Sequence, residues 1–275
     1  LGSAYTVAIQ PDGKIVVAGS GISVARYNTD GTPDNSFGIN GKIFTLIQRK
    51  SEAYSIGLDT DGKIVVAGYS EDSTFLVQSF IVARYLQNGI VDSSFGVNGI
   101  VITSLGSNGN SDYGHALVIQ TDGKMIVAGS SLEGSNRQFA AVRYNSNGSL
   151  DNSFGSNGIV KTWVNYNAEA YSIALQTDNK IVVAGYASDT SSSIYEDFAI
   201  VRYNTNGSID NAFGNNGIVT TQFGYEWNNA YSVAIQIDNK IVVAGSAHNQ
   251  TSGFVFALAR YNCGTVGITE FMPNY

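Results

Sequence analysis

Two glutamates occupy the same place in a repeated pattern, and paired carboxylates can carry acid–base chemistry. Glu52 and Glu169 each begin the segment EAYSI, so they would occupy matching positions if the chain is built from repeats. Glycosidases use two carboxyl groups, one as the acid and the other as the base or nucleophile. No third carboxylate or positioned histidine accompanies this pair, and no G-x-S-x-G elbow or phosphate loop is present. The sequence therefore predicts no catalytic residues and no enzyme, with a polysaccharide-active enzyme of glycosidase type kept as the alternative.

Aromatic residues gather in the segments that vary between the copies. Rings with a polar edge suit the faces of sugars or the surface of a partner protein. The alternative is that these rings only fill gaps between packed sheets. Together with Glu52 and Glu169, they form the predicted binding set, and its aromatic members are Trp163, Tyr166, Phe223, Tyr225, Trp227, Phe75, Tyr195 and Phe254.

Metal ligands and cofactor motifs are poorly represented. The segment YNTDGTPDNSF offers Asn28, Asp30 and Asp34, which calcium could use, but the other copies carry fewer carboxylates there. Turns capped by their own Asp or Asn side chains explain the pattern better. His115 stands where other copies have tyrosine, and His248 is isolated in a variable segment. We therefore predict no metal and no cofactor.

Charge and hydropathy narrow the possible partners. The 275-residue chain has a formal net charge of −7, which disfavours nucleic-acid binding. No apolar run reaches the roughly 20 residues that a membrane helix needs, so we expect no direct membrane insertion. The first residues lack the basic start and apolar core of a signal peptide. The single cysteine, Cys263, rules out an internal disulfide framework.

The elements that would position these residues come from a fivefold repeat. The segment DGKIVVAG occurs at 12–19 and 61–68, with close variants at 122–129, 178–185 and 238–245. The pair Arg-Tyr recurs every 58 or 59 residues, which indicates stacked units that cannot bury their faces alone. In the fourth copy, four strand-like runs occupy 170–176, 180–185, 197–204 and 217–223, and Asp-Asn joins the first two in a tight, two-residue hairpin turn.

These units predict an all-β fold, a five-bladed β-propeller with four antiparallel strands per blade. A solenoid is the alternative. We expect residues 1–263 to form the propeller and 264–275 to be a closing strand or a C-terminal linker. The turns inside each hairpin are uniform, whereas the segments between the second and third strands, and between units, vary. In an up-and-down blade the variable segments share one side, and we expect binding there.

The repeated text also resembles a known family. DGKIVVAG, followed by F-A-x-x-R-Y-N and then F-G, is similar to the delta-60 repeat, a propeller-type repeat of large secreted or surface bacterial proteins. The segment VGITEF resembles the linker before the sorting domain of proteins secreted by the type IX route. The resemblance implies an extracellular or cell-surface binding or display module. Its expected partners are a surface glycan, another secreted or surface protein, or the secretion machinery. A structural unit without a specific ligand is a further alternative.

Overall fold

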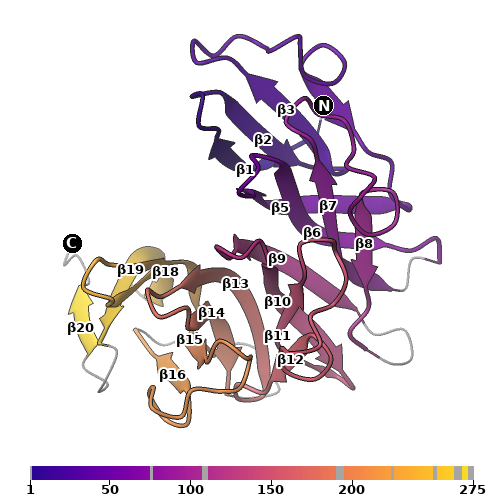
Figure 1. Cartoon of the computed structure of the whole chain (residues 1–275). Coiled ribbons are helices and arrows are strands. Elements are labelled where there is room, and N and C mark those ends of the chain that lie inside the picture. Colours follow the sequence, from indigo (N-terminus) through magenta and orange to yellow (C-terminus); the bar gives the residue numbers. More distant parts are fainter. Residues whose placement is uncertain are drawn as a thin grey trace. The chain divides into compact units, whose positions relative to one another are not determined.

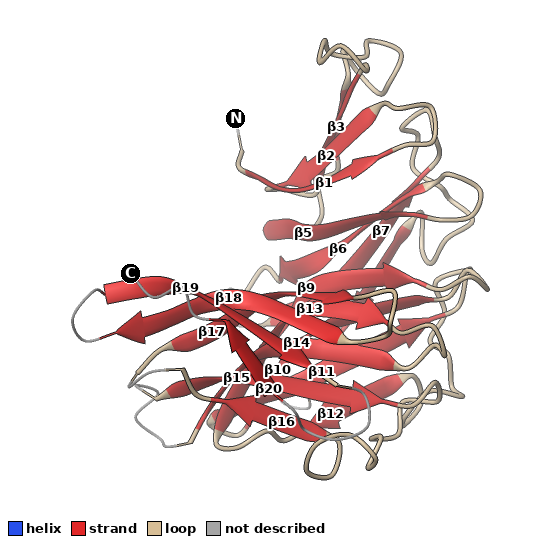
Figure 2. Cartoon of the chain, turned by 90° about the vertical axis from the view of Figure 1, so that its left-hand side faces the viewer, coloured by secondary structure: helices blue, strands red, loops and turns tan. Residues whose placement is uncertain are grey.

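The computed structural model describes residues 2–74, 77–106, 111–189, 195–223, 226–249, 253–262 and 268–271. Within these ranges the chain forms twenty β-strands and no helix. Figures 1 and 2 trace the strands along the chain. The strands group into five sheets of four, and each sheet contains one copy of the repeat. No helix in this part of the chain could span a membrane.

Each sheet is named here by its place in the sequence. Sheet 1 contains β1 (Ala4–Ile9), β2 (Ile15–Gly19), β3 (Ser23–Tyr27) and β4 (Lys42–Phe44). Sheet 2 contains β5 (Lys50–Leu58), β6 (Ile64–Glu71), β7 (Gln78–Tyr85) and β8 (Ile100–Thr103). Sheet 3 contains β9 (Asp112–Ile119), β10 (Met125–Glu133), β11 (Asn136–Tyr144) and β12 (Ile159–Thr162). Sheet 4 contains β13 (Asn167–Leu175), β14 (Ile181–Ser188), β15 (Glu196–Tyr203) and β16 (Ile218–Thr221). Sheet 5 contains β17 (Asn228–Ile235), β18 (Ile241–Asn249), β19 (Gly253–Tyr261) and β20 (Ile268–Phe271).

Strand order follows chain order in every sheet, and in sheet 4 each strand pairs antiparallel with the next. This up-and-down order is the one expected of propeller blades, and it confirms the predicted five-bladed β-propeller fold. The last strand, β20, pairs with β19 through Leu258 and Phe271. Residues 268–271 therefore form the fourth strand of sheet 5.

The first hairpin of each sheet differs from the two-residue turn that the sequence predicted. In sheet 1 the N–H of Gln10 donates to the carbonyl of Lys14, and the N–H of Gly13 donates to the carbonyl of Gln10. Three residues therefore form the loop, and the last of them, Gly13, has φ 82°. This is a type I turn followed by a left-handed residue, which the Asp-Gly pair fits as readily as a shorter turn.

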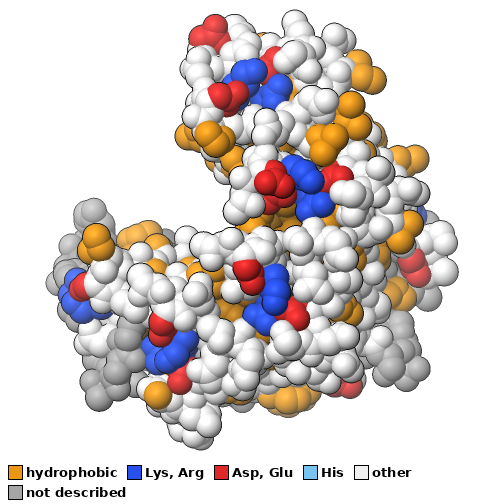
Figure 3. All heavy atoms as spheres, in the orientation of Figure 1, with side chains coloured by type: hydrophobic (Ala, Val, Ile, Leu, Met, Phe, Trp, Pro, Cys, Tyr) orange, Lys and Arg blue, Asp and Glu red, His pale blue; other side chains and the backbone are white. Residues whose placement is uncertain are grey.

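The recurring arginine of the third strand is held by the aspartate that follows it. Arg84 Nε donates to Asp92 Oδ2 at 2.9 Å, and Lys63 Nζ lies 2.9 Å from the same oxygen. Both partners of the Arg84–Asp92 pair are almost completely buried, and the guanidinium lies over the ring of Phe95. Figure 3 shows basic and acidic side chains touching at several places on one face of the molecule. The recurring arginine and aspartate of sheet 2 therefore belong to the scaffold.

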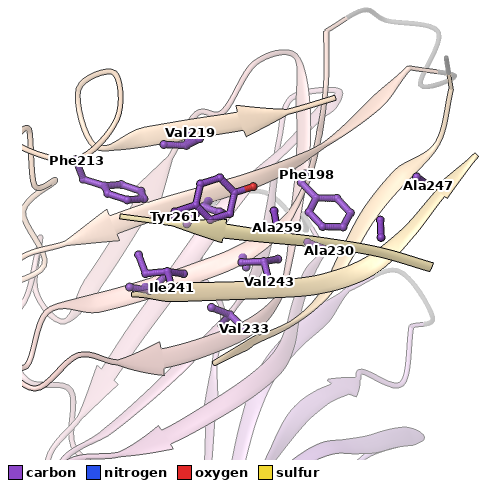
Figure 4. Close-up of a cluster of buried hydrophobic side chains, with 14 residues drawn as sticks. Phe198, Phe213, Val219, Ala230, Val233, Ile241, Val243, Ala247, Ala259 and Tyr261 are labelled. Atoms are coloured by element: carbon purple, nitrogen blue, oxygen red, sulfur yellow. The ribbon is translucent and has the colours of Figure 1, made fainter. Parts of the chain in front are cut away.

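The chain divides into two compact units, and each has its own core. The first unit comprises residues 1–127 and 142–151, and the second comprises 128–141 and 152–275. In the second unit, side chains of sheets 4 and 5 interdigitate, and Figure 4 shows the ring of Tyr261 beside Phe213 and Val219. The hydroxyl of Tyr261 lies 2.8 Å from Thr221 Oγ1, so the buried phenol is paired.

Candidate functional site

Glu169 lies near the start of β13, the first strand of sheet 4. Ser130 Oγ donates a hydrogen bond to Glu169 Oε1 at 3.2 Å, and Tyr186 OH donates a longer one to Oε2 at 3.5 Å. Arg137 Nη1 in turn donates to Ser130 Oγ at 3.2 Å. Ser130 is completely buried, so its hydroxyl is a fixed donor to the carboxylate. The arrangement favours a charged carboxylate on Glu169.

Glu196 is the first residue of β15 in the same sheet. Its Oε2 accepts a 2.8 Å hydrogen bond from Asn229 Nδ2 on β17 of sheet 5. Burial raises the pKa of Glu196, and the negative charge of Glu169 raises it further, whereas the Asn229 hydrogen bond opposes both effects. Glu196 is therefore a carboxyl group that keeps its proton to a higher pH than usual.

Tyrosine rings flank the two carboxyl groups. Tyr186 pairs with Glu169 across β13 and β14, and its ring lies 5.8 Å from that of Tyr171. Tyr171 also lies 5.8 Å from Tyr231 of sheet 5, whose side chain is exposed. Burial, and next the charge of Glu169, raises the pKa of both Tyr171 and Tyr186, so the phenols stay neutral donors. A surface of rings beside carboxylates is suited to sugar.

The carboxyl groups of Glu169 and Glu196 have different environments, although they are close enough to influence each other electrostatically. One accepts hydrogen bonds from hydroxyl groups, and the other is partly desolvated. Acid–base catalysis needs two titratable groups whose surroundings give them different pKa values. The pKa of Glu196 is therefore shifted toward the protonated form, while the hydrogen bonds to Glu169 favour its carboxylate.

Glu52 lies in the equivalent place in sheet 2, within the first unit. It pairs with Tyr69 as Glu169 pairs with Tyr186, but Lys50 Nζ lies 3.8 Å from Glu52 Oε1. The residue of β7 that corresponds to Glu196 is Gln78, which cannot act as an acid. Sheet 2 thus has the same framework with one carboxyl group replaced by an amide. The suggested pairing of Glu52 with Glu169 stays a prediction, because they belong to different units.

A second group of rings lies at the end of sheet 5. Trp227 stacks on Phe254 with centroids 6.2 Å apart, and the ring of His248 meets both edge-on, at 5.4 and 5.2 Å. Phe254 is 62% exposed. His248 Nδ1 lies 3.3 Å from Glu226 Oε2 without hydrogen-bond geometry. The main chain of Trp227 also forms a bridge with Glu196, so this aromatic group adjoins the carboxyl pair.

The remaining predicted binding residues lie in several places. Trp163, Tyr166 and Tyr195 are exposed, at 48%, 42% and 46%. Phe223 is partly buried and packs edge-on against Phe198, with centroids 4.8 Å apart. Phe75 and Tyr225 lie outside the described residues. Of the predicted set, the structure brings Trp227 and Phe254 into contact.

Several residues of this site were missed by sequence reasoning. Glu196, Ser130, Tyr186 and Asn229 come from four different strands, and only Glu169 was singled out. A usable signal exists in the segment EDFAIVRY, because Glu196 shares the face of Phe198 and Ile200 in an alternating strand. A carboxyl group on a buried face requires an explanation. Among the described residues, no group of three potential ligands could hold a metal ion.

Comparison with known proteins establishes the family. Five segments match the β-propeller repeat domain of unknown function DUF5122, at residues 10–37, 60–95, 120–154, 176–213 and 236–262. The chain belongs to this β-propeller family. No curated protein matches the chain. The DUF5122 segments begin near each first hairpin and end near the Phe-Gly pair or the third strand, as the repeat pattern predicted.

Several solved structures resemble the chain. A protein of unknown function from Bacteroides caccae is 14% identical with a TM-score of 0.53, and the match covers 98% of this chain and 82% of that one. An α-L-arabinofuranosidase of family GH43 from Clostridium thermocellum is 12% identical with a TM-score of 0.45, covering 98% and 94%. An endo-1,5-α-L-arabinanase from Thermotoga petrophila is 11% identical with a TM-score of 0.44, covering 97% and 73%.

These matches correct one prediction. The sequence led us to expect that the chain is not an enzyme, yet glycoside hydrolases are among the solved structures that it resembles. That expectation was drawn only from the carboxylates that stand out in the repeat pattern. Glu196 lies in a segment that varies between copies and so was not considered.

Proposed function

We propose that the DUF5122 chain hydrolyses glycosidic bonds with Glu196 as the acid and Glu169 as the base. The observation that carries the proposal is the placement of two carboxyl groups of sheet 4 in different surroundings: Glu196 is partly buried and accepts a hydrogen bond from Asn229, whereas Glu169 accepts hydrogen bonds from Ser130 and Tyr186. Burial and the charge of Glu169 raise the pKa of Glu196, which is the direction that a catalytic acid beside a charged carboxylate requires. A surface polysaccharide is the proposed substrate class, since tyrosine rings border the pair.

The reaction follows from the two protonation states. The Glu196 carboxyl gives its proton to the glycosidic oxygen as the bond to the anomeric carbon breaks. The Glu169 carboxylate takes a proton from a water molecule, whose oxygen bonds to the anomeric carbon. The products are two sugars with free hydroxyl groups, and the two glutamates exchange protons with solvent to return to their starting states.

Hydrogen bonds support these roles. Asn229 fixes Glu196 from sheet 5, while Ser130 and Tyr186 orient both oxygens of Glu169. Groups held in this way lose little freedom when substrate binds, which lowers the barrier. Tyr171 and Tyr231 would stack against the sugar next to the cleaved bond.

Reducing-sugar release from a panel of plant, algal and bacterial polysaccharides tests this function. We expect turnover by the native chain, a loss of at least about 100-fold on Glu196→Gln or Glu169→Gln, and no loss on Glu52→Gln. Glu52→Gln is the matched control because sheet 2 already carries Gln78 in place of the acid. Equal activity of all three variants, or no turnover across the panel, would contradict the proposal.

A second candidate function is glycan or protein binding through the Trp227, His248 and Phe254 group. Its support is the exposed ring of Phe254 stacked on Trp227 beside two ionisable side chains. Glycan-array binding should be lost on Trp227→Ala together with Phe254→Ala. Binding should persist in the control variant Trp163→Ala, which removes a different exposed ring. Binding that survives the double substitution would refute this candidate.

Export to the cell surface completes the proposal. It rests on the resemblance to delta-60 repeats and on the type IX-like segment VGITEF, and a surface polysaccharide would be accessible there. Fractionation of the native host should find the protein outside the inner membrane. Recovery from the cytoplasm alone would exclude both the location and the secretion route.

A further inference from the structure

The hydroxyl group of Ser130 lies between an arginine and a glutamate of the proposed site. Arg137 Nη1 donates to Ser130 Oγ at 3.2 Å, and Ser130 Oγ donates to Glu169 Oε1 at the same distance. A guanidinium group has five donors and no acceptor, so the lone pair of Ser130 that faces Arg137 is occupied. The hydroxyl proton must then go to another acceptor, which is the Glu169 carboxylate. Arg137 therefore fixes the direction of the hydrogen bond that reaches Glu169.

The equivalent serine of sheet 1 has different hydrogen-bond partners. Ser20 also follows the repeated glycine of the second strand, and its main chain forms a bridge with Glu52 of sheet 2. Ser20 Oγ accepts from the N–H of Ser3 at 3.3 Å and donates to the hydroxyl of Tyr5 at 3.4 Å. Glu52 Oε2 is buried, and no described residue donates a hydrogen bond to it. A serine at this position therefore does not bind the glutamate of the next sheet by itself.

The arginine is not a requirement of the scaffold. Arg137 stands two residues before Phe139, the buried phenylalanine of the third strand. The same place holds Gln78 in sheet 2, Glu196 in sheet 4 and Phe254 in sheet 5. Sheets with the same four-strand order therefore carry different side chains there. In sheets 2 to 5 the arginine occurs only in sheet 3, which precedes the strand that contains the catalytic base.

Arg137 is also attached to sheet 4 by its main chain. Its N–H donates to Asn167 Oδ1 at 2.7 Å, and Asn167 begins β13 two residues before Glu169. Ser130 is completely buried and Arg137 is half-buried, and a hydrogen bond in such surroundings is stronger than the same bond in water. All four residues belong to the second unit, so their contacts lie within it. The arginine is thus held in a fixed place beside the glutamate.

We propose that Arg137 is a positioning residue that keeps Glu169 in its role as the base by acting through Ser130. The inference rests on the proposed hydrolysis. Four titratable or charged side chains act on this carboxyl group, and they are Arg137 of β11, Tyr171 of β13, Tyr186 of β14 and Glu196 of β15. Of these four, only the arginine carries a positive charge. It therefore favours ionisation of Glu169 before Glu196.

Carbon-13 NMR titration of the glutamate carboxyl groups tests the inference without requiring turnover. Arg137→Gln should move the titration of Glu169 to higher pH, and by more than that of Glu196, because the lost charge acts through the Ser130 hydrogen bond. Lys161→Gln is the matched control. It removes a positive charge from the same sheet, where Lys161 Nζ lies 3.0 Å from Glu133 Oε2, and should leave the Glu169 titration unchanged. An unchanged Glu169 titration in Arg137→Gln, or equal shifts in both variants, would overturn the inference.

A double-mutant cycle tests whether the arginine acts through the serine. Ser130→Ala and Arg137→Gln should each move the Glu169 titration to higher pH, and the double variant should move it no further than the larger single change. The acid limb of the kcat/KM profile should shift in the same way, because a base works only when it is ionised. Additive shifts would show that Arg137 acts independently of Ser130 and would overturn the inference. The expected titrations without turnover on any polysaccharide would support the link from Arg137 to Glu169 and contradict only the proposed hydrolysis.

Discussion

Asn229 of sheet 5 donates a 2.8 Å hydrogen bond to the carboxyl group of Glu196 in sheet 4. This contact joins two consecutive repeats at positions where the repeat pattern varies. In sheet 2 the residue matching Glu196 is Gln78, so the fold does not require a carboxyl group there. The glutamate and its asparagine partner are therefore additions to the scaffold, and they support the acid–base role proposed for sheet 4.

Removal of the asparagine should shift the pH dependence of hydrolysis. Its hydrogen bond lowers the pKa of Glu196, so Asn229→Ala should raise that pKa. A catalytic acid works only while protonated, and activity falls as pH rises through its pKa. The alkaline limb of the rate profile should therefore move to higher pH in the variant. A limb that moves to lower pH would contradict the role of Glu196.

Stability should also depend on Glu196. A carboxyl group whose folded pKa is raised contributes stability that is fully present below its unfolded pKa, about 4.3, and is lost as pH rises through the folded value. The free energy of unfolding of the native chain, measured with a chemical denaturant, should therefore decline as pH rises from the unfolded to the folded pKa of Glu196. Glu196→Gln should remove this part of the decline, while Asp238→Asn, at an exposed turn, should leave it in place.

The buried arginine–aspartate pairs should dominate the acid stability of the scaffold. Burial opposes ionisation of Asp92, but Ser94, Lys63 and Arg84 more than offset it and lower its pKa. The stabilising effect is present above the unfolded value near 3.9 and is lost as pH falls below it. Asp92→Asn should cost about 2–4 kcal/mol at pH 7, because Arg84 stays buried without its carboxylate. Urea unfolding measures this loss of unfolding free energy, and a loss below about 0.5 kcal/mol would show that the pair does not stabilise the fold.

The tyrosine–threonine pairs offer a matched comparison of buried and half-buried hydroxyl groups. Tyr203→Phe removes the partner of Thr162 inside a sealed interface and should cost about 1–2 kcal/mol of unfolding free energy. Tyr27→Phe makes the same change at the half-buried tyrosine of sheet 1 and should cost little. Equal costs in denaturant unfolding would indicate that Tyr27 is as buried as Tyr203.

Most of the fold could be predicted from the sequence because the chain contains five copies of the same four-strand pattern. The period indicated the number of units, and the Asp-Gly and Asp-Asn pairs located the first hairpin of each unit. The first hairpin loop has three residues instead of the predicted two. Asp-Gly fits a two-residue turn, and it also fits a three-residue loop whose last residue is left-handed. Positive φ at Gly13 and Asn179 satisfies either geometry.

The candidate site was harder to predict because it departs from the repeat. Glu169 was found through its twin, Glu52, whereas Glu196 has no acidic twin and depends on Asn229 of the next sheet. Contacts between consecutive sheets follow from strand register and side-chain direction, which a single sequence does not fix in the variable segments. The aromatic residues were predicted as one binding set, but the sequence did not indicate that Trp227 and Phe254 would be in contact.

The most direct test of the account is a carbon-13 NMR titration of the glutamate carboxyl groups. The account predicts that Glu196 titrates above the usual range for glutamate in the native chain and that its pKa falls in Glu169→Gln, where the neighbouring charge is gone. Glu52→Gln should leave the Glu196 titration unchanged. A Glu196 that titrates normally, or that does not respond to Glu169→Gln, would contradict the central claim that the two glutamates act as a pair.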